Sequence, residues 1–245
     1  MRIPRLYLDD DLAPGREIEL PKNRAHYLLN VLRLADGAEL VLFDGRRALD
    51  FRARLAVSGR RARVRIDSVS DNRLESPLDS HLLQAVGKPD HVDWLVQKTA
   101  ELGLRRLTLF NAERTQTPLR GARLEKKLAH WRGVAAAACE QCGRSLLPRI
   151  DFAPGLEAAI QNDMAELKLL LDFDGQPLAS LVSDNPPDRP SVSCLIGPEG
   201  GLNAGEIKLA RAKGYIGWRL GPRVLRMETA ATAALTLLQQ SLGDL

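Results

Sequence analysis

Apolar and polar residues alternate along most of residues 1–70, which is the pattern of short strands with one buried face. The alternation predicts strands at residues 5–8, 17–20, 40–43, 48–57 and 61–69. Asp44-Gly45 suits the turn of a β-hairpin, and residues 23–32 are expected to form a short helix. We therefore expect a small β-barrel domain in residues 1–70.

From residue 81 the pattern changes to buried apolar runs that alternate with helical stretches. Strands are predicted at residues 82–86, 107–110, 167–173, 192–196 and 215–220, and helices at 90–102, 122–142, 203–213 and 228–241. Asp90 is a predicted N-cap, and Asn203 forms a predicted capping box with Glu206. This alternation predicts a mostly parallel sheet covered on both faces, in a domain of residues 81–245 behind a polar linker of residues 71–80.

Two Gly-Pro turns follow predicted strands of this second domain. Residues 196–202 read IGPEGGL, and residues 220–229 read LGPRVLRMET. Glycine permits backbone dihedrals and close approaches that other residues do not, and proline fixes its own φ. Ligands of open parallel sheets bind beyond the carboxyl ends of the strands, so the two turns predict a small-molecule pocket. The glycine spacing matches neither a dinucleotide fingerprint nor a P-loop, and a plain strand-to-helix turn is the alternative.

Composition and charge narrow the class of protein. The chain has 245 residues, a net charge of +4 and no apolar stretch of the length of a signal peptide or a membrane span, so we expect a cytoplasmic protein. Cys139 and Cys142 fall at the end of a predicted helix, away from the N-terminal position that activates a thiol. With no second cysteine pair and no metal-like spacing of histidines, we expect no metal site.

Arginine is concentrated on the last two strands of the first domain. Between Gly45 and Arg65 there are eight arginines and one acidic residue, Asp50. Their spacing of two places many of them on one face of a strand, where guanidinium groups suit RNA phosphates. The alternative is a solvated outer face of a half-buried sheet.

Several motifs in order resemble the bacterial 16S ribosomal RNA uridine-N3 methyltransferases, which belong to the SPOUT, or trefoil-knot, methyltransferases. The resemblance runs almost end to end through residues 1–5, 31–33, 88–90, 93–103, 113–114 and 137–144 and the two Gly-Pro turns. It implies a PUA-like β-barrel for RNA, followed by a knotted α/β domain. It also implies S-adenosylmethionine as cofactor, 16S ribosomal RNA of the small subunit as partner, and a homodimer in which the partner subunit completes the site.

The resemblance further assigns site residues. Expected cofactor contacts are Leu171 (or its neighbour Asp172), Ile196, Gly197, Pro198, Glu199, Gly200, Gly201, Leu220, Gly221, Val224, Leu225, Arg226 and Thr229. Expected RNA contacts are Arg33, Arg52, Arg54, Arg61, Arg63, Arg65, Lys88 and Arg114.

The reaction requires removal of the uracil N3 proton, and the negative charge then spreads to the ring oxygens. Arg226 or Arg114 is the candidate that stabilises this charge, and Glu199 or Glu228 is the candidate proton acceptor or neighbour of the sulfonium. An Arg226–Glu228 ion pair that only caps the last helix is the alternative. Three other functions stay open: an RNA-binding or ribosome-assembly protein without catalysis, a nucleotide-cofactor enzyme, and a SPOUT methyltransferase with another RNA target.

Overall fold

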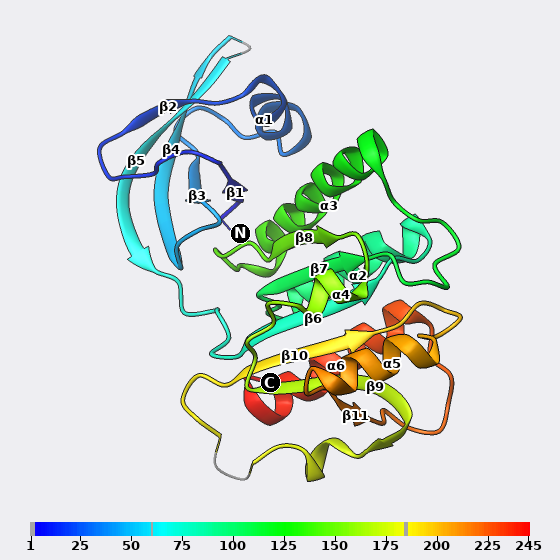
Figure 1. Cartoon of the computed structure of the whole chain (residues 1–245). Helices are drawn as coiled ribbons and strands as arrows, with labels where there is room; N and C mark the ends of the chain where they lie inside the picture. Colours follow the sequence, from blue (N-terminus) through cyan, green and yellow to red (C-terminus); the bar gives the residue numbers. More distant parts are fainter. Residues whose placement is uncertain (1–2, 60, 184–185) are drawn as a thin grey trace. The chain divides into compact units, whose positions relative to one another are not determined.

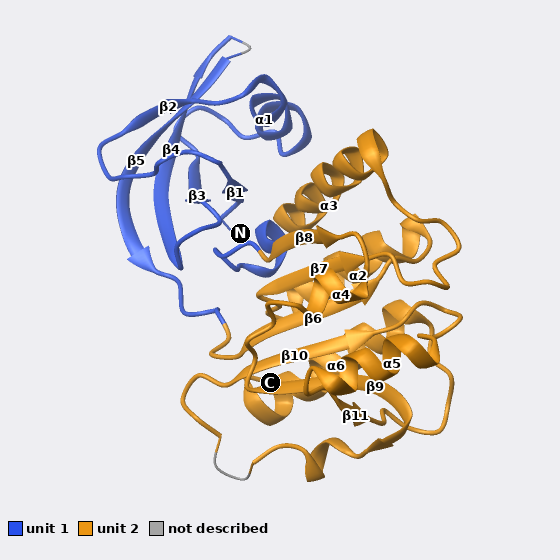
Figure 2. Cartoon of the chain, viewed as in Figure 1, with its two compact units in different colours: residues 1–75, 139–147 blue, residues 76–138, 148–245 orange. Residues whose placement is uncertain are grey.

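The computed structural model describes residues 3–59, 61–183 and 186–245. The chain divides into two compact units (Figure 2). Unit 1 comprises Met1–Glu75 and Cys139–Leu147, and unit 2 comprises Ser76–Ala138 and Pro148–Leu245. The boundary near residue 75 falls inside the expected linker. The second segment of unit 1 lies within the range that the sequence assigned to the second domain.

Unit 1 is built on a five-stranded sheet in the order β1-β3-β4-β5-β2 (Figure 1). Its strands are β1 (Arg5–Tyr7), β2 (Glu17–Glu19), β3 (Glu39–Phe43), β4 (Leu49–Ser58) and β5 (Arg61–Asp71). Buried and exposed residues alternate along the two long strands, so one face supplies a core that includes Phe51, Leu55, Val64 and Ile66. The predicted alternation is thus confirmed.

The predicted helix at residues 23–32 is in fact two short elements. Helix α1 (Lys22–His26) runs into a π-helical turn at Tyr27–Val31, which closes with a hydrogen bond from the Leu32 amide to the Tyr27 carbonyl. Arg33 then takes a positive φ of 54°, which stops the helix.

A buried polar network holds Cys139–Leu147 within unit 1. Arg5 makes a two-pronged contact with Asp50 at 2.8 and 2.9 Å and also donates to the Ser145 hydroxyl. Arg144 contacts Glu75, and the second carboxylate oxygen of Glu75 accepts the amides of Ser145 and Leu146. Burial would raise the pKa of Asp50, but hydrogen bonds, with that from Arg5 the largest, hold it below its ordinary value.

Unit 2 is built on a six-stranded sheet in which every neighbouring pair is parallel, in the order β11-β9-β10-β6-β7-β8. The strands are β6 (Asp79–Ala85), β7 (Arg106–Phe110), β8 (Arg149–Ala153), β9 (Leu167–Gln176), β10 (Ser191–Ile196) and β11 (Ile216–Trp218). The chain builds β6, β7 and β8 outward in one direction. It then crosses to β9 and inserts β10 between β9 and β6, so the order of strands reverses there.

Helices cover both faces of this sheet. Residues such as Leu82, Leu169 and Cys194 face α2 (Pro89–Glu101), α3 (Gly121–Cys142) and α6 (Met227–Leu242). Their chain neighbours Leu83, Leu170 and Leu195 face α4 (Leu156–Ile160) and α5 (Ala204–Ala212). The continuous apolar runs therefore mark strands that are buried on both sides, as predicted. A buried Gln239 joins α6 to α2 by donating to the Leu102 carbonyl at 2.7 Å.

Two helix starts test the predicted caps. The capping box is confirmed, because Asn203 accepts the Glu206 amide and Glu206 accepts the Asn203 amide. The Asp90 cap is wrong: α2 begins at Pro89 with Lys88 as N-cap, because a proline at N1 starts the helix one residue earlier.

Three elements of unit 2 were not predicted from the sequence: β8, α4 and the 3₁₀ turn at Leu178–Ser180.

Candidate functional site

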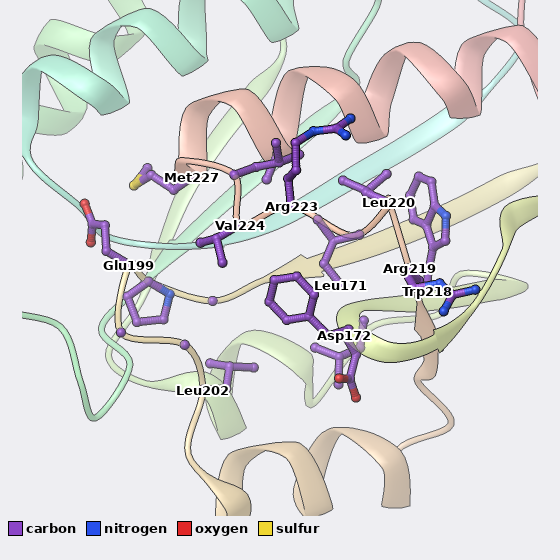
Figure 3. Close-up of a pocket in the computed structure, with 18 of the residues that line it drawn as sticks. Leu171, Asp172, Glu199, Leu202, Trp218, Arg219, Leu220, Arg223, Val224 and Met227 are labelled. Carbon is purple, nitrogen blue, oxygen red and sulfur yellow. The ribbon is translucent and has the colours of Figure 1, made fainter.

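A pocket of about 460 Å³ lies at the carboxyl ends of β9, β10 and β11, entirely within unit 2 (Figure 3). Three chain segments form its walls: residues 170–173 of β9, residues 197–202 after β10, and residues 218–221 and 223–225, which begin with the last residue of β11. Ile207 of α5 and Met227 and Ala230 at the start of α6 complete it. Glu199 and Met227 lie at one end and Trp218 and Arg219 at the other (Figure 3). Both Gly-Pro turns therefore contribute to one pocket.

Glycines allow the walls to approach one another. A Cβ on Gly175 of β9 would lie 2.5 Å from the Gly217 carbonyl carbon and the Trp218 amide nitrogen. A Cβ on Gly197 would lie 3.1 Å from the Leu202 amide nitrogen. Gly221, with φ of 143°, takes a conformation that L side chains rarely adopt. The shape of the pocket thus depends on backbone packed against backbone.

The loop after β7 is tied to the first Gly-Pro turn. Arg114 donates from Nη1 to the Gly200 carbonyl at 2.9 Å, and the Glu113 amide donates to Glu206 at 3.0 Å. The Asn203 side-chain amide also donates to the Glu113 carboxylate. These contacts place the Arg114 side chain against Gly200, which lines the pocket.

Three ionisable side chains, which we call the Glu199–His91–Glu228 cluster, meet at the Glu199 end of the pocket. His91 Nδ1 lies 3.5 Å from Glu228 Oε2 and 3.9 Å from Glu199 Oε1. Gly87 leaves room for Met227 and Glu199, because a Cβ there would lie 2.1 Å from Met227 Sδ and 3.1 Å from Glu199 Oε1. Two carboxylates therefore converge on a single ring nitrogen.

Most of the expected cofactor residues line the pocket. They are Leu171, Gly197, Pro198, Glu199, Gly200, Gly201, Leu220, Gly221, Val224 and Leu225, together with Asp172. Ile196, Arg226 and Thr229 do not: Ile196 is buried as the last residue of β10, and Arg226 and Thr229 are exposed at the start of α6. Glu228 lies beside His91, and no Arg226–Glu228 ion pair forms within the described part of the chain. The ion pair considered as an alternative role for Arg226 is therefore wrong.

Several lining residues were not predicted from the sequence. They are Leu170, Phe173, Leu202, Ile207, Trp218, Arg219, Arg223, Met227 and Ala230. Leu202, Arg223 and Met227 fall inside the two motifs and could have been included with their neighbours. Phe173 could have been noticed as a large aromatic residue at the end of a predicted strand, and it is 56% exposed.

The predicted arginine face exists on the outer side of β4 and β5, where Arg52, Arg54, Arg61, Arg63 and Arg65 are exposed. The sheet also brings acidic residues from neighbouring positions to that face. Arg54 contacts Glu39 at 3.3 Å and Asp67 at 3.2 Å, and Arg63 lies 4.0 Å from Glu19. The local positive charge is therefore smaller than the sequence count indicates, and among the described ion pairs none involves Arg52, Arg61 or Arg65.

The thiols show no sign of activation. A hydrogen bond with Cys142 and then burial raise the pKa of Cys139, and burial raises the pKa of Cys194. The described residues contain no group of three or more His, Cys, Asp or Glu side chains placed to hold a metal ion. Within the same residues, no helix combines the length and apolar content that a membrane crossing requires.

The pocket suits a nucleoside-containing cofactor. Its volume lies within the range of small-molecule sites, roughly 300–1,000 Å³. Leu171, Trp218, Leu220 and Leu225 give it apolar walls, while Gly197, Gly200 and Gly201 expose backbone at the opposite wall. Glu199 and Asp172 supply carboxylates. Such a site can take a flat heterocycle and a positively charged group without a metal ion.

Comparison with known proteins identifies the class. Residues 74–239 match the model of an RNA methyltransferase domain, and residues 20–67 match that of an RNA methyltransferase PUA domain. A methyltransferase of Legionella pneumophila solved with bound S-adenosylmethionine is 36% identical, with a TM-score of 0.92 and full coverage of both chains. The chain is thus an RNA methyltransferase of the SPOUT type with an N-terminal PUA domain, which confirms the predicted fold class.

Whole-chain relatives define the family more closely. Ribosomal RNA small subunit methyltransferase E of Buchnera aphidicola (strain Sg) is 32% identical over 100% of this chain and 98% of its own length. The protein of that name from Neisseria gonorrhoeae, solved with S-adenosylmethionine, is 32% identical, with a TM-score of 0.89 and 99% coverage of both chains. The chain belongs to the ribosomal RNA small subunit methyltransferase E family.

Proposed function

We propose that this protein transfers the methyl group of S-adenosylmethionine to N3 of a uridine in the RNA of the small ribosomal subunit. The observation that carries the proposal is the pocket that the two Gly-Pro turns form at the carboxyl ends of three strands. Relatives that match the chain from end to end carry the name of a small-subunit ribosomal RNA methyltransferase, and two similar structures hold the expected cofactor.

The pocket residues would hold the cofactor largely through shape and backbone. Gly197, Gly200 and Gly201 offer main-chain groups, while Leu220 and Leu225 offer apolar contact. When bound, S-adenosylmethionine supplies a methyl group already activated by its sulfonium. The protein then has two tasks. It must align the uracil ring, and it must accept the N3 proton and stabilise the negative charge that this proton leaves on the ring.

Arg114 is the better placed of the two candidate arginines, because its side chain is held at Gly200. A guanidinium beside Gly200 would stabilise negative charge on the uracil oxygens as the N3 proton leaves. Arg226 precedes α6 with an exposed side chain, so it can turn toward the RNA. Glu199 lines the pocket and is the candidate that receives the proton.

RNA binding would use the exposed arginines of unit 1, namely Arg33, Arg52, Arg54, Arg61, Arg63 and Arg65, together with Lys88 and Arg114 of unit 2.

We further propose a homodimer acting in the cytoplasm. Helices α2 and α6 expose large apolar side chains, Trp94 and Leu237, which a second copy could cover. Sedimentation of the purified protein at several concentrations tests the dimer, and a monomer throughout would refute it.

Nucleoside mass spectrometry of small-subunit RNA tests the substrate. Cells that lack the protein should lose one N3-methyluridine, and full retention would refute the assignment. Calorimetry tests the cofactor: S-adenosylmethionine should bind, whereas preference for a nicotinamide dinucleotide would favour the nucleotide-cofactor enzyme.

The catalytic role of the arginines is tested by single-turnover methylation with Arg114→Ala and Arg226→Ala. Unchanged methyl transfer in a folded variant that still binds cofactor would remove that arginine from the mechanism.

A further inference from the structure

His91 lies next to Glu199, a residue of the pocket wall, and has no role in the proposed reaction so far. Its Nδ1 lies between Glu228 Oε2 and Glu199 Oε1, at 3.5 and 3.9 Å. Nδ1 and Glu228 Oε2 are both buried, and neither has a hydrogen-bond partner among the described residues. Of these three side chains only Glu199 lines the pocket, so the other two can act only through it.

The Glu199–His91–Glu228 cluster has two carboxylates for one imidazole ring. A buried carboxylate oxygen without a partner is costly, and the Glu228 side chain is only 12% exposed. Within the described residues, the one cationic partner in ion-pair range of Glu228 is the His91 ring. A proton delivered to Nδ1 during the reaction would face two carboxylates and give both buried atoms a partner. The cluster is therefore built to accept one proton without becoming positively charged.

We propose that His91 is a positioning residue which, together with Glu228, completes a proton relay whose pocket-facing member is Glu199. The inference rests on the proposed function. Glu199 takes the proton from uracil N3, and the N–H electron pair becomes the new bond from N3 to the methyl carbon. The carbon–sulfur bond breaks and its electron pair stays on sulfur. Glu199 passes the proton to His91 Nδ1, where Glu199 and Glu228 balance the imidazolium charge.

The surroundings of His91 contain few competing charges. Helix α6 contributes Glu228 and, just before it, Arg226, and the loop after β10 contributes Glu199. Lys88 and Asp90 flank the start of α2, the helix that carries His91. Asp93, two residues further along α2, pairs with His130 of α3 at 2.8 Å. Lys88, Asp90 and Arg226 take part in no ion pair that involves only described residues.

His130 provides a matched control, because it is also a helical histidine in contact with a carboxylate, but its partner Asp93 does not line the pocket, whereas the Glu199 beside His91 does. In ¹⁵N spectra of histidine-labelled protein without cofactor or RNA, the His91 Nδ1 resonance should move in Glu228→Gln and in Glu199→Gln. The His130 resonances should not move. A His91 resonance unaffected by both substitutions would show that Nδ1 does not contact the two carboxylates and would overturn the relay.

The second measurement is single-turnover methylation across a range of pH, at saturating cofactor and RNA. His91→Asn should slow methyl transfer by about 100-fold, the scale of general-base catalysis, and should alter the pH profile. Affinity for S-adenosylmethionine and the thermal midpoint should stay close to wild type, and His130→Gln should match wild type throughout. His91→Gln serves as a second variant if His91→Asn is unstable.

The outcomes separate the two proposals. A wild-type protein that methylates no ribosomal RNA would refute the proposed function, while the ¹⁵N spectra would still decide whether Nδ1 contacts the two carboxylates. An active His91→Asn protein with the wild-type rate and pH profile would overturn the relay and leave the proposed function intact.

Discussion

Gly175→Ala is expected to separate the two walls of the pocket. The new Cβ would lie 2.5 Å from the Gly217 carbonyl carbon and the Trp218 amide nitrogen. Ordinary van der Waals contact begins near 3.4 Å, so the β9 and β11 backbones must move apart by about 0.9 Å. No side-chain rotation can relieve the clash, because all three nearest atoms belong to the backbone.

The cost should be that of an overpacked core, about 1–3 kcal/mol of unfolding free energy. Cofactor affinity should fall as well, because β9 supplies Leu171 and the segment after β11 supplies Leu220 on facing walls. We expect a loss of at least about tenfold, equivalent to about 1.4 kcal/mol. Urea denaturation measures the first quantity, and calorimetry with S-adenosylmethionine measures the second.

Gly133→Ala is the matched control. Gly133 lies within α3, and a Cβ there meets no atom within 4 Å. Alanine at that position should stabilise the helix by about 1 kcal/mol and leave cofactor affinity unchanged. If Gly175→Ala kept both the stability and the affinity of the wild type, close packing of β9 against β11 would not define the pocket.

Three further predictions follow from the charges. Burial would raise the pKa of Asp163, but the polar side chains of His81, Ser193 and Tyr215 around it, of which Tyr215 donates a hydrogen bond at 2.6 Å, hold the pKa well below its ordinary value, so Asp163 stabilises the fold above about pH 4. That contribution is lost as the pH falls toward the folded-state pKa. In Asp163→Asn, the urea concentration at the midpoint of unfolding should therefore fall less steeply with decreasing pH than in the wild type. Glu75→Gln removes the carboxylate that Arg144 contacts and should lower the unfolding free energy by about 3–5 kcal/mol; a loss under 1 kcal/mol would contradict a buried ion pair. Arg61→Ala should reduce the salt dependence of RNA binding by about one charge, whereas Arg54→Ala, whose guanidinium already contacts two carboxylates, should change it less; equal effects would argue against neutralisation.

Periodicity predicted the elements that are buried in a regular way. The strands around Leu82, Leu169 and Cys194 are apolar on both faces, and each was predicted from its own residues. Strand β8 was missed because Arg149 and Asp151 interrupt its short apolar pattern. Helix α4 was missed because five residues are too few to show a helical period.

The parts of the site that lie in short sequence motifs were predicted. The parts that depend on contacts between distant residues were missed. The Gly-Pro turns are visible in sequence because proline and glycine restrict or free the backbone wherever they occur. His91 appeared as an isolated histidine, since its partners lie more than one hundred residues away in the chain. The arginine count of β4 and β5 overstated the charge because Glu39 and Glu19 reach that face only through strand pairing.

The division of unit 1 into two segments determines when its contacts can form during synthesis. Asp50 and Glu75 leave the ribosome well before Ser145 and Arg144, which donate further hydrogen bonds to Asp50 and to Glu75 respectively. The first 75 residues therefore cannot complete their polar network until residue 147 has emerged, although N-terminal domains commonly fold first. For the same reason, exchange of this unit between relatives requires transfer of both segments, because a cut at residue 75 would leave buried charges without partners.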